Sequence, residues 1–271
     1  MPLLIVKTGK GLSLGCSSWA ERGNYALAFA YHLIQTKIEN CMETIRETFE
    51  PSPAAELALA KLEAKLLSIR KYPPKSVSTL LGAEGYAAVT YFRCWHSFPL
   101  PWQGTGRKPI PQDWRRIGAR MTTYKGNQFA RHPVNAMLNY AYGMLENQVR
   151  TQVLAMGFDP AIGYLHAPES GSPILIFDLM EPLRPIIDKK LLGFIKNHVF
   201  FPSDFLMTKM GICKLHPQFA RNIIKLVQDL KEIELFTENN LKKLLALHPA
   251  AAKKAGKNII AFKARLVGKR E

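Results

Sequence analysis

The chain has few cysteines and no long hydrophobic run. Its four cysteines are scattered without a C-x-x-C pair: Cys16, Cys41, Cys94 and Cys213. This pattern argues against a zinc ribbon and a disulfide framework, and it fits a reducing cytoplasm. The longest apolar stretch, 25–33, is interrupted by His32 and is too short to span a bilayer, and no charged segment precedes the first apolar residues as in a signal peptide. These absences predict a soluble cytoplasmic protein with no membrane partner.

Acidic residues are also scarce, since 21 Asp and Glu stand against 37 Lys and Arg, a formal net charge of +16. The segment 103–131 has one acid, Asp113, and seven basic residues, a net charge of +6: Arg107, Lys108, Arg115, Arg116, Arg120, Lys125 and Arg131. The tail 253–270 has seven basic residues and no acid. This distribution favours a polyanionic partner, of which nucleic acid is the commonest. A solubilising tail and attraction to anionic lipid are the alternatives.

Apolar spacing predicts a mainly α-helical fold, and a hydrophobic fraction of 47% is enough to fill a core. The predicted helices are 25–49, 54–71, 76–94, 134–156, 186–199, 216–232 and 237–246. No repeat is present, so we expect a short N-terminal extended segment (1–24), one helical domain (25–250) and a basic flexible tail (251–271). Gly82 and Gly85, inside the third predicted helix, are each expected to permit the close approach of a neighbouring element.

The stretch 166–182, HAPESGSPILIFDLMEP, combines His166 with two carboxylates, Asp178 and Glu181. The short apolar runs on either side of its Gly/Pro turn, 162–165 and 174–177, predict a small β-like hairpin near His166. The spacing Asp-x-x-Glu, in capping-box-like positions, predicts that a helix begins near Asp178. Imidazole and carboxylate ligands suit Mg²⁺ or Mn²⁺. The alternatives are a partly buried histidine with a satisfied ring and acids stabilised by a helix macrodipole.

Glu84 is a charged residue in an otherwise apolar, small-residue stretch, LLGAEGYAAVTYF. A charge on a tightly packed helical face is costly unless it is paired or bound to a metal. The sequence therefore leaves two interpretations open. Glu84 is either a metal ligand contributed by a distant helix or the partner of an arginine from the basic segment 103–131.

Four motifs resemble, in order and spacing, the CRISPR-associated integrase/endonuclease family, which inserts new spacers into CRISPR arrays: LLGAEGYAAVTYF, NAMLNYAYGML, GFDPAIGYLH and DLMEPLRPIID. The resemblance covers about residues 25–230 and implies the helical catalytic domain of that family. There, a glutamate of EG-x-A-A, the histidine ending G-x-x-H and an acid of D-L-x-E/D hold the divalent metal. Carried over, these are Glu84, His166 and Glu181. Asp178 is a supporting acid that contacts the metal or orients the histidine.

The resemblance also implies partners: DNA, a second copy of the chain, and the small nuclease-like protein of the adaptation complex. In the family, a β-rich domain of roughly ninety residues precedes the helical domain, and it builds much of the dimer interface and the platform for the small partner. About twenty residues stand before the predicted helices of this sequence, too few for a sheet with its own core. The expected metal ligands all lie in the helical part, so the chemistry depends less on that domain than assembly does.

These observations predict a metal-dependent DNA integrase or endonuclease, in which Mg²⁺ or Mn²⁺ activates a DNA 3′-hydroxyl or water and stabilises charge at the phosphate. The basic residues of 103–131 are expected to track the DNA backbone. Trp95, Trp102 and Trp114 either stack on a splayed base or pack inside the protein, and Glu146 is interpreted as a surface or structural residue. A non-catalytic DNA-binding homologue and an RNA-directed or general phosphodiesterase are the alternative functions.

Overall fold

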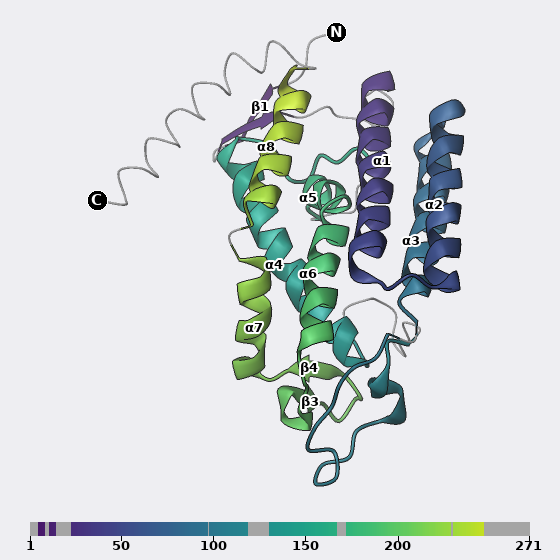
Figure 1. Cartoon of the computed structure of the whole chain (residues 1–271). Coiled ribbons are helices and arrows are strands. Elements are labelled where there is room, and N and C mark those ends of the chain that lie inside the picture. The colour runs from purple at the N-terminus through teal and green to yellow at the C-terminus, as the bar shows by residue number, and fades with distance from the viewer. Residues whose placement is uncertain are drawn as a thin grey trace.

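The computed structural model describes residues 5–8, 11–14, 23–96, 98–118, 130–166, 172–228 and 230–246, with side chains from residue 26 onward. A short antiparallel hairpin, β1 (Ile5–Thr8) and β2 (Gly11–Leu14), precedes the helices. Three long helices then stand side by side: α1 (Gly23–Thr48), α2 (Pro53–Lys71) and α3 (Val77–Cys94) (Figure 1). Serine caps start the second and third of them, because Ser52 accepts the N–H of Ala55 and Ser76 accepts that of Thr79.

The remaining helices form a second group beside α1 (Figure 1). The longest is α4 (Pro133–Ala155), and α5 (Ile174–Met180), α6 (Arg184–Asn197), α7 (Pro217–Val227) and α8 (Lys231–Ala246) pack against it. The two groups join where α1 contacts α5 and α6. Ile34, Ile38 and Cys41 of α1 are buried in a core that continues into both groups. This junction also positions the candidate site.

The lower end in Figure 1 is irregular and aromatic. It contains the segment 98–118 with a short 3₁₀ helix, η2 (Gln112–Arg115), a second 3₁₀ turn, η3 (Pro202–Asp204), and the antiparallel hairpin β3 (Phe205–Met207) and β4 (Cys213–Leu215). Trp102 stacks on Trp114 with ring centroids 5.8 Å apart, and both rings contact Phe205. Trp95 and Trp114 are buried. The tryptophans therefore pack inside the protein, the second of their two expected roles.

The mainly helical fold and most of the predicted helices are confirmed, but the helix predicted at 216–232 ends at Val227, and the one predicted at 237–246 already begins at Lys231. The small hairpin is confirmed as an element, but its position near His166 is wrong, because 174–180 is helical and the hairpin of this domain lies at 205–215. Asp178 lies inside α5, not at its start, and it caps no helix. A Cβ added at Gly82 or Gly85 meets nothing within 4 Å, so these glycines permit no close contact. The basic tail lies outside the described residues, and the division into domains stays a prediction.

Within the described ranges, Cys41, Cys94 and Cys213 are free and buried. Among the same residues, no helix is both long and apolar enough to cross a membrane. Glu146 forms an ion pair with Arg150, one turn further along α4, at 2.5 Å and remains about one third exposed. It therefore lies on the surface, as its position on the predicted helix indicated.

Candidate functional site

Asp178 holds the loop that carries His166. This aspartate is fully buried on α5, and its two carboxylate oxygens accept the backbone N–H groups of Tyr164, Leu165 and His166, the last two at 2.9 and 3.2 Å. The same carboxylate lies 2.7 Å from Nδ1 of the His166 ring. These bonds occupy the carboxylate, so Asp178 orients the histidine instead of facing the centre of the site.

Gly163 explains why the loop can lie so close to α5. A Cβ at this position would stand 2.0 Å from Cγ2 of Ile174 and 2.9 Å from Oδ2 of Asp178. Only glycine allows the backbone to approach this closely. The glycine of the G-x-x-H motif thus brings the N–H groups that follow it within reach of Asp178.

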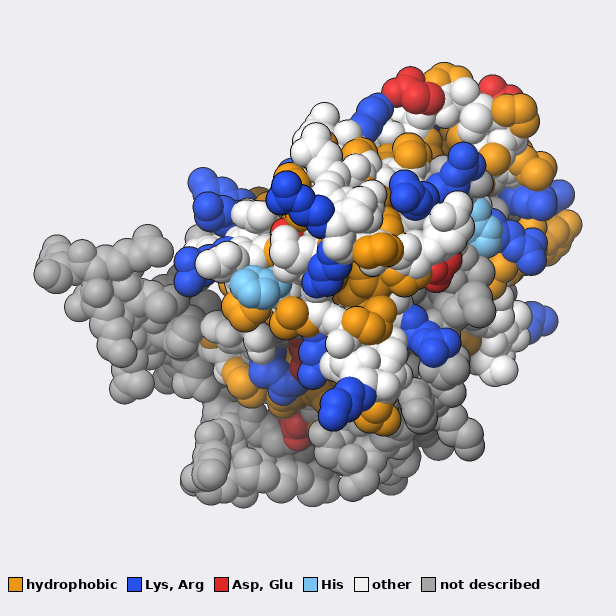
Figure 2. All heavy atoms as spheres, turned by 90° about the horizontal axis from the view of Figure 1, so that it is seen from below, with side chains coloured by type: hydrophobic (Ala, Val, Ile, Leu, Met, Phe, Trp, Pro, Cys, Tyr) orange, Lys and Arg blue, Asp and Glu red, His pale blue; other side chains and the backbone are white. Residues whose placement is uncertain are grey.

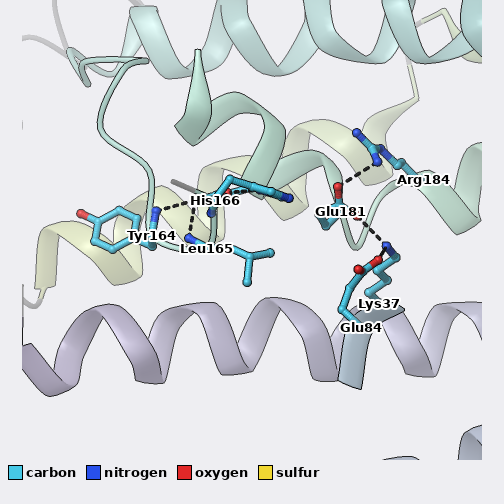
Figure 3. Close-up of polar contacts among 8 residues, drawn as sticks. Lys37, Glu84, Tyr164, Leu165, His166, Glu181 and Arg184 are labelled. Atoms are coloured by element: carbon cyan, nitrogen blue, oxygen red, sulfur yellow. Dashed lines mark hydrogen bonds and ion pairs between the residues drawn. The ribbon is translucent and has the colours of Figure 1, made fainter. Parts of the chain in front are cut away.

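The His166 ring is set up as a metal ligand or a base. Because Asp178 accepts the hydrogen bond of Nδ1, the proton belongs on that nitrogen and Nε2 keeps its lone pair. The hydrogen bond to Asp178 raises the pKa of His166 above its ordinary value, although burial acts in the opposite direction. The ring is still 40% exposed and extends toward the side on which Glu181 lies (Figure 3).

Glu84 and Glu181 share one cation, the ammonium of Lys37 (Figure 3). Lys37 lies in the middle of α1, Glu84 lies on α3 and Glu181 follows the last residue of α5. Nζ of Lys37 is 2.6 Å from Oε2 of Glu181 and also donates to Oε1 of Glu84. The ion pair expected for Glu84 is therefore present, but with a lysine of α1 and not with an arginine of the basic segment.

Arg184 completes the charge balance around Glu181. Its guanidinium lies 2.8 Å from Oε1 of Glu181, one turn away. Burial favours the neutral form of Glu181, yet the positive charges of Arg184 and Lys37 outweigh it and lower the pKa of the carboxyl. Burial likewise opposes the charge on Lys37, and the carboxylates of Glu181 and Glu84 outweigh it and raise the pKa of the amine. Glu181 and Lys37 are therefore both charged at neutral pH.

A second buried carboxylate, Asp188, lies behind the site on α6. It accepts hydrogen bonds from the hydroxyls of Tyr142 at 2.6 Å and Tyr91 at 3.2 Å. Complete burial raises its pKa to about 7 in spite of these donors. The guanidinium of Arg184 sits 5.4 Å from the centre of the Tyr142 ring, which connects this pair of tyrosines to the candidate site.

Sequence reasoning missed Lys37, Arg184 and Asp188. Lys37 did leave a signal, because it falls on the face of the predicted helix 25–49 that also carries Ile34, Ile38 and Cys41. A lysine on the buried face of an amphipathic helix needs a buried partner. Nothing in the local pattern identified that partner, because Glu84 and Glu181 are 47 and 144 residues away in the sequence.

The donor set fits Mg²⁺ or Mn²⁺ in its chemistry. Glu84 and Glu181 already hold one cationic group between them, and His166 offers a neutral nitrogen beside Glu181. In the part of the chain that the structure describes, no three His, Cys, Asp or Glu side chains stand together closely enough to hold a metal ion. The carboxylates of Glu84 and Glu181 are arranged around an ammonium.

The basic residues of the segment 103–131 lie at the other end of α3. From Glu84 to Cys94 the helix rises about 15 Å, and the basic segment follows beyond. Arg107, Lys108, Arg115 and Arg116 are exposed, and the last two line an open cavity together with His96. Figure 2, which views this end from below, shows Lys and Arg side chains distributed over the whole face between hydrophobic ones. Arg131 is half-buried, and Arg120 and Lys125 lie outside the described residues.

The fold is that of known integration proteins. A casposase bound to integration product matches with a TM-score of 0.59 and 23% identity, over 78% of this chain and 57% of that one. A chain of a Cas6-RT-Cas1–Cas2 complex matches with a TM-score of 0.66 and 18% identity, over 86% of this chain and 25% of that one. At these identities the likeness concerns the fold. The class of protein defined is thus a mainly helical domain with the fold seen in these two structures.

Sequence comparison specifies the family. The family described as CRISPR associated protein Cas1 matches residues 13–229, and the chain belongs to it. One relative, the CRISPR-associated endonuclease Cas1 of Leptospira interrogans, is 27% identical over 223 residues, which cover 80% of this chain and 82% of the relative. The expected resemblance is therefore confirmed.

Proposed function

We propose that this chain is a cytoplasmic, divalent-metal-dependent DNA integrase or endonuclease of the CRISPR adaptation type, which joins or cleaves strands by phosphoryl transfer. One observation carries the proposal: Glu84 and Glu181, which arrive from different helices, bind a single cationic group, and Asp178 fixes His166 where the charge of Glu181 acts on its ring. Membership of the Cas1 family supports the reaction class. The name of the Leptospira relative, an endonuclease, agrees with it.

Glu84, His166 and Glu181 would hold Mg²⁺ or Mn²⁺, which supplies charge stabilisation at the scissile phosphate and activates a 3′-hydroxyl or water. Asp178 keeps the proton of His166 on Nδ1, so that Nε2 can act as a ligand. The guanidinium of Arg184 offsets the negative charge of Glu181 and leaves the ring of His166 available as a ligand. The chain needs no side-chain nucleophile for this reaction, because the attacking oxygen belongs to DNA or to water.

The exposed basic residues at the lower end would bind the DNA backbone. A strand that runs from Glu84 along α3 to Cys94, beyond which the basic segment follows, covers about 15 Å, which corresponds to about four phosphate spacings. Arginine and lysine contacts of this kind fix the register of the strand without reading bases. Association with a second copy and with a small nuclease-like protein belongs to the same proposal, and a structural neighbour that is a Cas6-RT-Cas1–Cas2 complex supports the second association.

The test is strand transfer or cleavage of branched and nicked DNA in the presence of Mn²⁺. Glu84→Ala and His166→Ala are expected to abolish the reaction, whereas Glu146→Ala, a glutamate paired on the surface of α4, is expected to keep it. Activity that survives both site substitutions contradicts the assignment. DNA binding with a steep salt dependence and no turnover under any metal supports the non-catalytic alternative. Preference for an RNA substrate supports a general phosphodiesterase.

A further inference from the structure

Lys37 occupies the space between the two candidate carboxylate ligands. Its side chain is 10% exposed, and Nζ contacts Oε1 of Glu84 and Oε2 of Glu181. A buried lysine is costly unless it is paired, and here the pairing is complete. Lys37 stands between the two carboxylates, whose like charges would otherwise repel each other in a site that is largely closed to water. Lys37 therefore organises the site.

The oxygens that bind Lys37 are the same oxygens that a metal ion between the two glutamates would need. The other oxygen of Glu181 is taken by Arg184 at 2.8 Å. A divalent cation placed next to the Lys37 ammonium would face a strong repulsion, because like charges a few ångströms apart in a partly buried site interact far more strongly than in water. The ammonium and the metal ion exclude each other.

We propose that Lys37 is a resident counter-cation of the site, an inference that rests on the proposed function. Lys37 holds Glu84 and Glu181 together in the metal-free protein, and it leaves both when a divalent ion binds between them. Lys37 is thus a positioning residue that sets the affinity for metal. The lysine side chain has four rotatable methylenes, so Nζ can move by several ångströms while α1 stays in place.

The consequence is a competition that lowers the apparent affinity for metal. A protein in which the ammonium occupies the carboxylates is not competent to bind the ion, and the apparent dissociation constant rises in inverse proportion to the competent fraction. Removing the ammonium while keeping the apolar stem of the side chain should tighten metal binding. Lys37→Met makes this change, since methionine fills most of the same space.

The matched control is Lys189→Met. Lys189 of α6 also bridges two glutamates of α1, with Nζ 2.7 Å from Glu43 and 3.2 Å from Glu47. Among the described residues, the ion-pair partner of both glutamates is Lys189, and neither glutamate forms an ion pair with a residue of the candidate site. The control therefore removes the same charge and the same type of bridge, a lysine between two glutamates, without changing the occupancy of Glu84 and Glu181.

The first measurement is calorimetric titration of the full chain with Mn²⁺. Lys37→Met is expected to lower the Kd for Mn²⁺ by about tenfold. This is the change expected if about one tenth of the wild-type protein has its carboxylates free to bind the ion. Lys189→Met is expected to match the wild type. Equal or weaker Mn²⁺ binding by Lys37→Met overturns the displacement and leaves the proposed function standing. An absence of Mn²⁺ binding in wild type and variants alike overturns both.

The second measurement follows metal binding in the wild-type site, and a variant is used only to assign one signal. In protein labelled with ¹³C at the lysine ε-carbons, the Lys37 signal is assigned by its loss in Lys37→Arg, and Mg²⁺ is added to the wild type. The Lys37 signal is expected to move toward the position of a free lysine over the range in which Mg²⁺ binds, while the Lys189 signal stays unchanged. Metal binding without a shift of the Lys37 signal overturns the proposal.

Discussion

Asp178 binds both the ring and the backbone of His166. Oδ1 of the aspartate lies 2.7 Å from Nδ1 of the ring and 3.2 Å from the backbone nitrogen of the same residue. A residue bound at both points has its tautomer and its rotamer fixed before any ligand arrives. The buried aspartate is therefore the group through which the loop and the candidate ligand are held as one unit.

Asp178→Asn should weaken metal binding and destabilise the protein. In the variant, the side-chain NH₂ must face a backbone N–H group whose hydrogen bond the wild-type carboxylate accepts. Buried donors are then left unpaired, at a cost of about 1–3 kcal/mol. Loss of an orienting partner of this kind lowers metal affinity by about 10- to 100-fold. The pKa of His166 should fall, because the carboxylate raises it in the wild type. Urea unfolding, Mn²⁺ calorimetry and NMR titration of the ring measure the three effects.

Asp159→Asn is the control for this substitution. Asp159 accepts the N–H of Ala161 at 2.9 Å in the turn that precedes the His166 loop, and it lies nearer the surface. Its replacement is expected to change the free energy of unfolding by less than about 1 kcal/mol and to leave metal affinity unchanged. Equal effects of the two substitutions would contradict the special position of Asp178.

Gly163→Ala should displace the His166 loop from α5. The added methyl group would stand 2.0 Å from Cγ2 of Ile174, far inside contact distance. Either the loop or the helix must move, and forcing a group into packed structure costs about 1–3 kcal/mol. Because the N–H groups after Gly163 bind Asp178, the displacement should also lower metal affinity. Thermal unfolding and Mn²⁺ calorimetry measure both.

Gly82→Ala gives the opposite expectation and serves as the matched glycine control. Gly82 is exposed inside α3, and a Cβ there meets nothing within 4 Å. Alanine in an exposed helix interior is favoured over glycine by about 1 kcal/mol. The melting temperature should therefore rise for Gly82→Ala and fall for Gly163→Ala. A fall for both would indicate that the chain tolerates no change at these glycines for reasons outside the local contacts.

Asp188 should make the stability of the protein depend on pH. Burial raises its pKa to about 7, whereas an aspartate in the unfolded chain titrates near 3.8. A group whose pKa is raised on folding stabilises the protein fully below the unfolded pKa. That contribution is lost as the pH rises through the folded pKa. The loss from this residue thus extends from about pH 4 to somewhat above pH 7.

Asp188→Asn removes this loss, because the amide stays neutral at every pH. The melting temperature of the variant relative to the wild type is expected to rise between about pH 4 and pH 7 and then to level off, because in this range Asp188 is ionised in the unfolded chain and protonated in the folded protein. Tyr142→Phe, which removes the donor at 2.6 Å, should raise the pKa of Asp188 and extend the decline in stability to higher pH than in the wild type. Parallel curves for the wild type and Asp188→Asn would contradict the assignment.

Local signals were sufficient to predict the helices but not the element that carries Asp178. The run 174–177, Ile-Leu-Ile-Phe, is apolar and β-branched, which favours a strand, yet it forms the first half of α5. A short apolar run cannot be assigned by periodicity alone. The helical conformation is favoured here by a tertiary contact, because the helical turn brings the carboxylate of Asp178 to the N–H groups of the preceding loop.

The ligand candidates themselves could be predicted, because each lies in a motif with a family resemblance, but their electrostatic partners could not. Lys37 meets Glu181 across 144 residues of sequence, and Asp188 meets Tyr91 across 97. Such contacts depend on how α1, α3 and α6 pack, which no window of sequence contains. The charge on the buried face of the first helix indicated only that a partner must exist.

Arg115→Ala with Arg116→Ala should weaken DNA binding mainly through electrostatics. Both side chains are exposed beside His96 at the lower end of the molecule. Each lost phosphate contact is expected to reduce the slope of log K against log salt by about one, uniformly across DNA sequences. Fluorescence anisotropy with duplex and branched DNA at several salt concentrations measures this. The control is Lys61→Ala, which removes an exposed charge on α2 and should keep the wild-type slope. An unchanged slope for the arginine variant would place the DNA on another face.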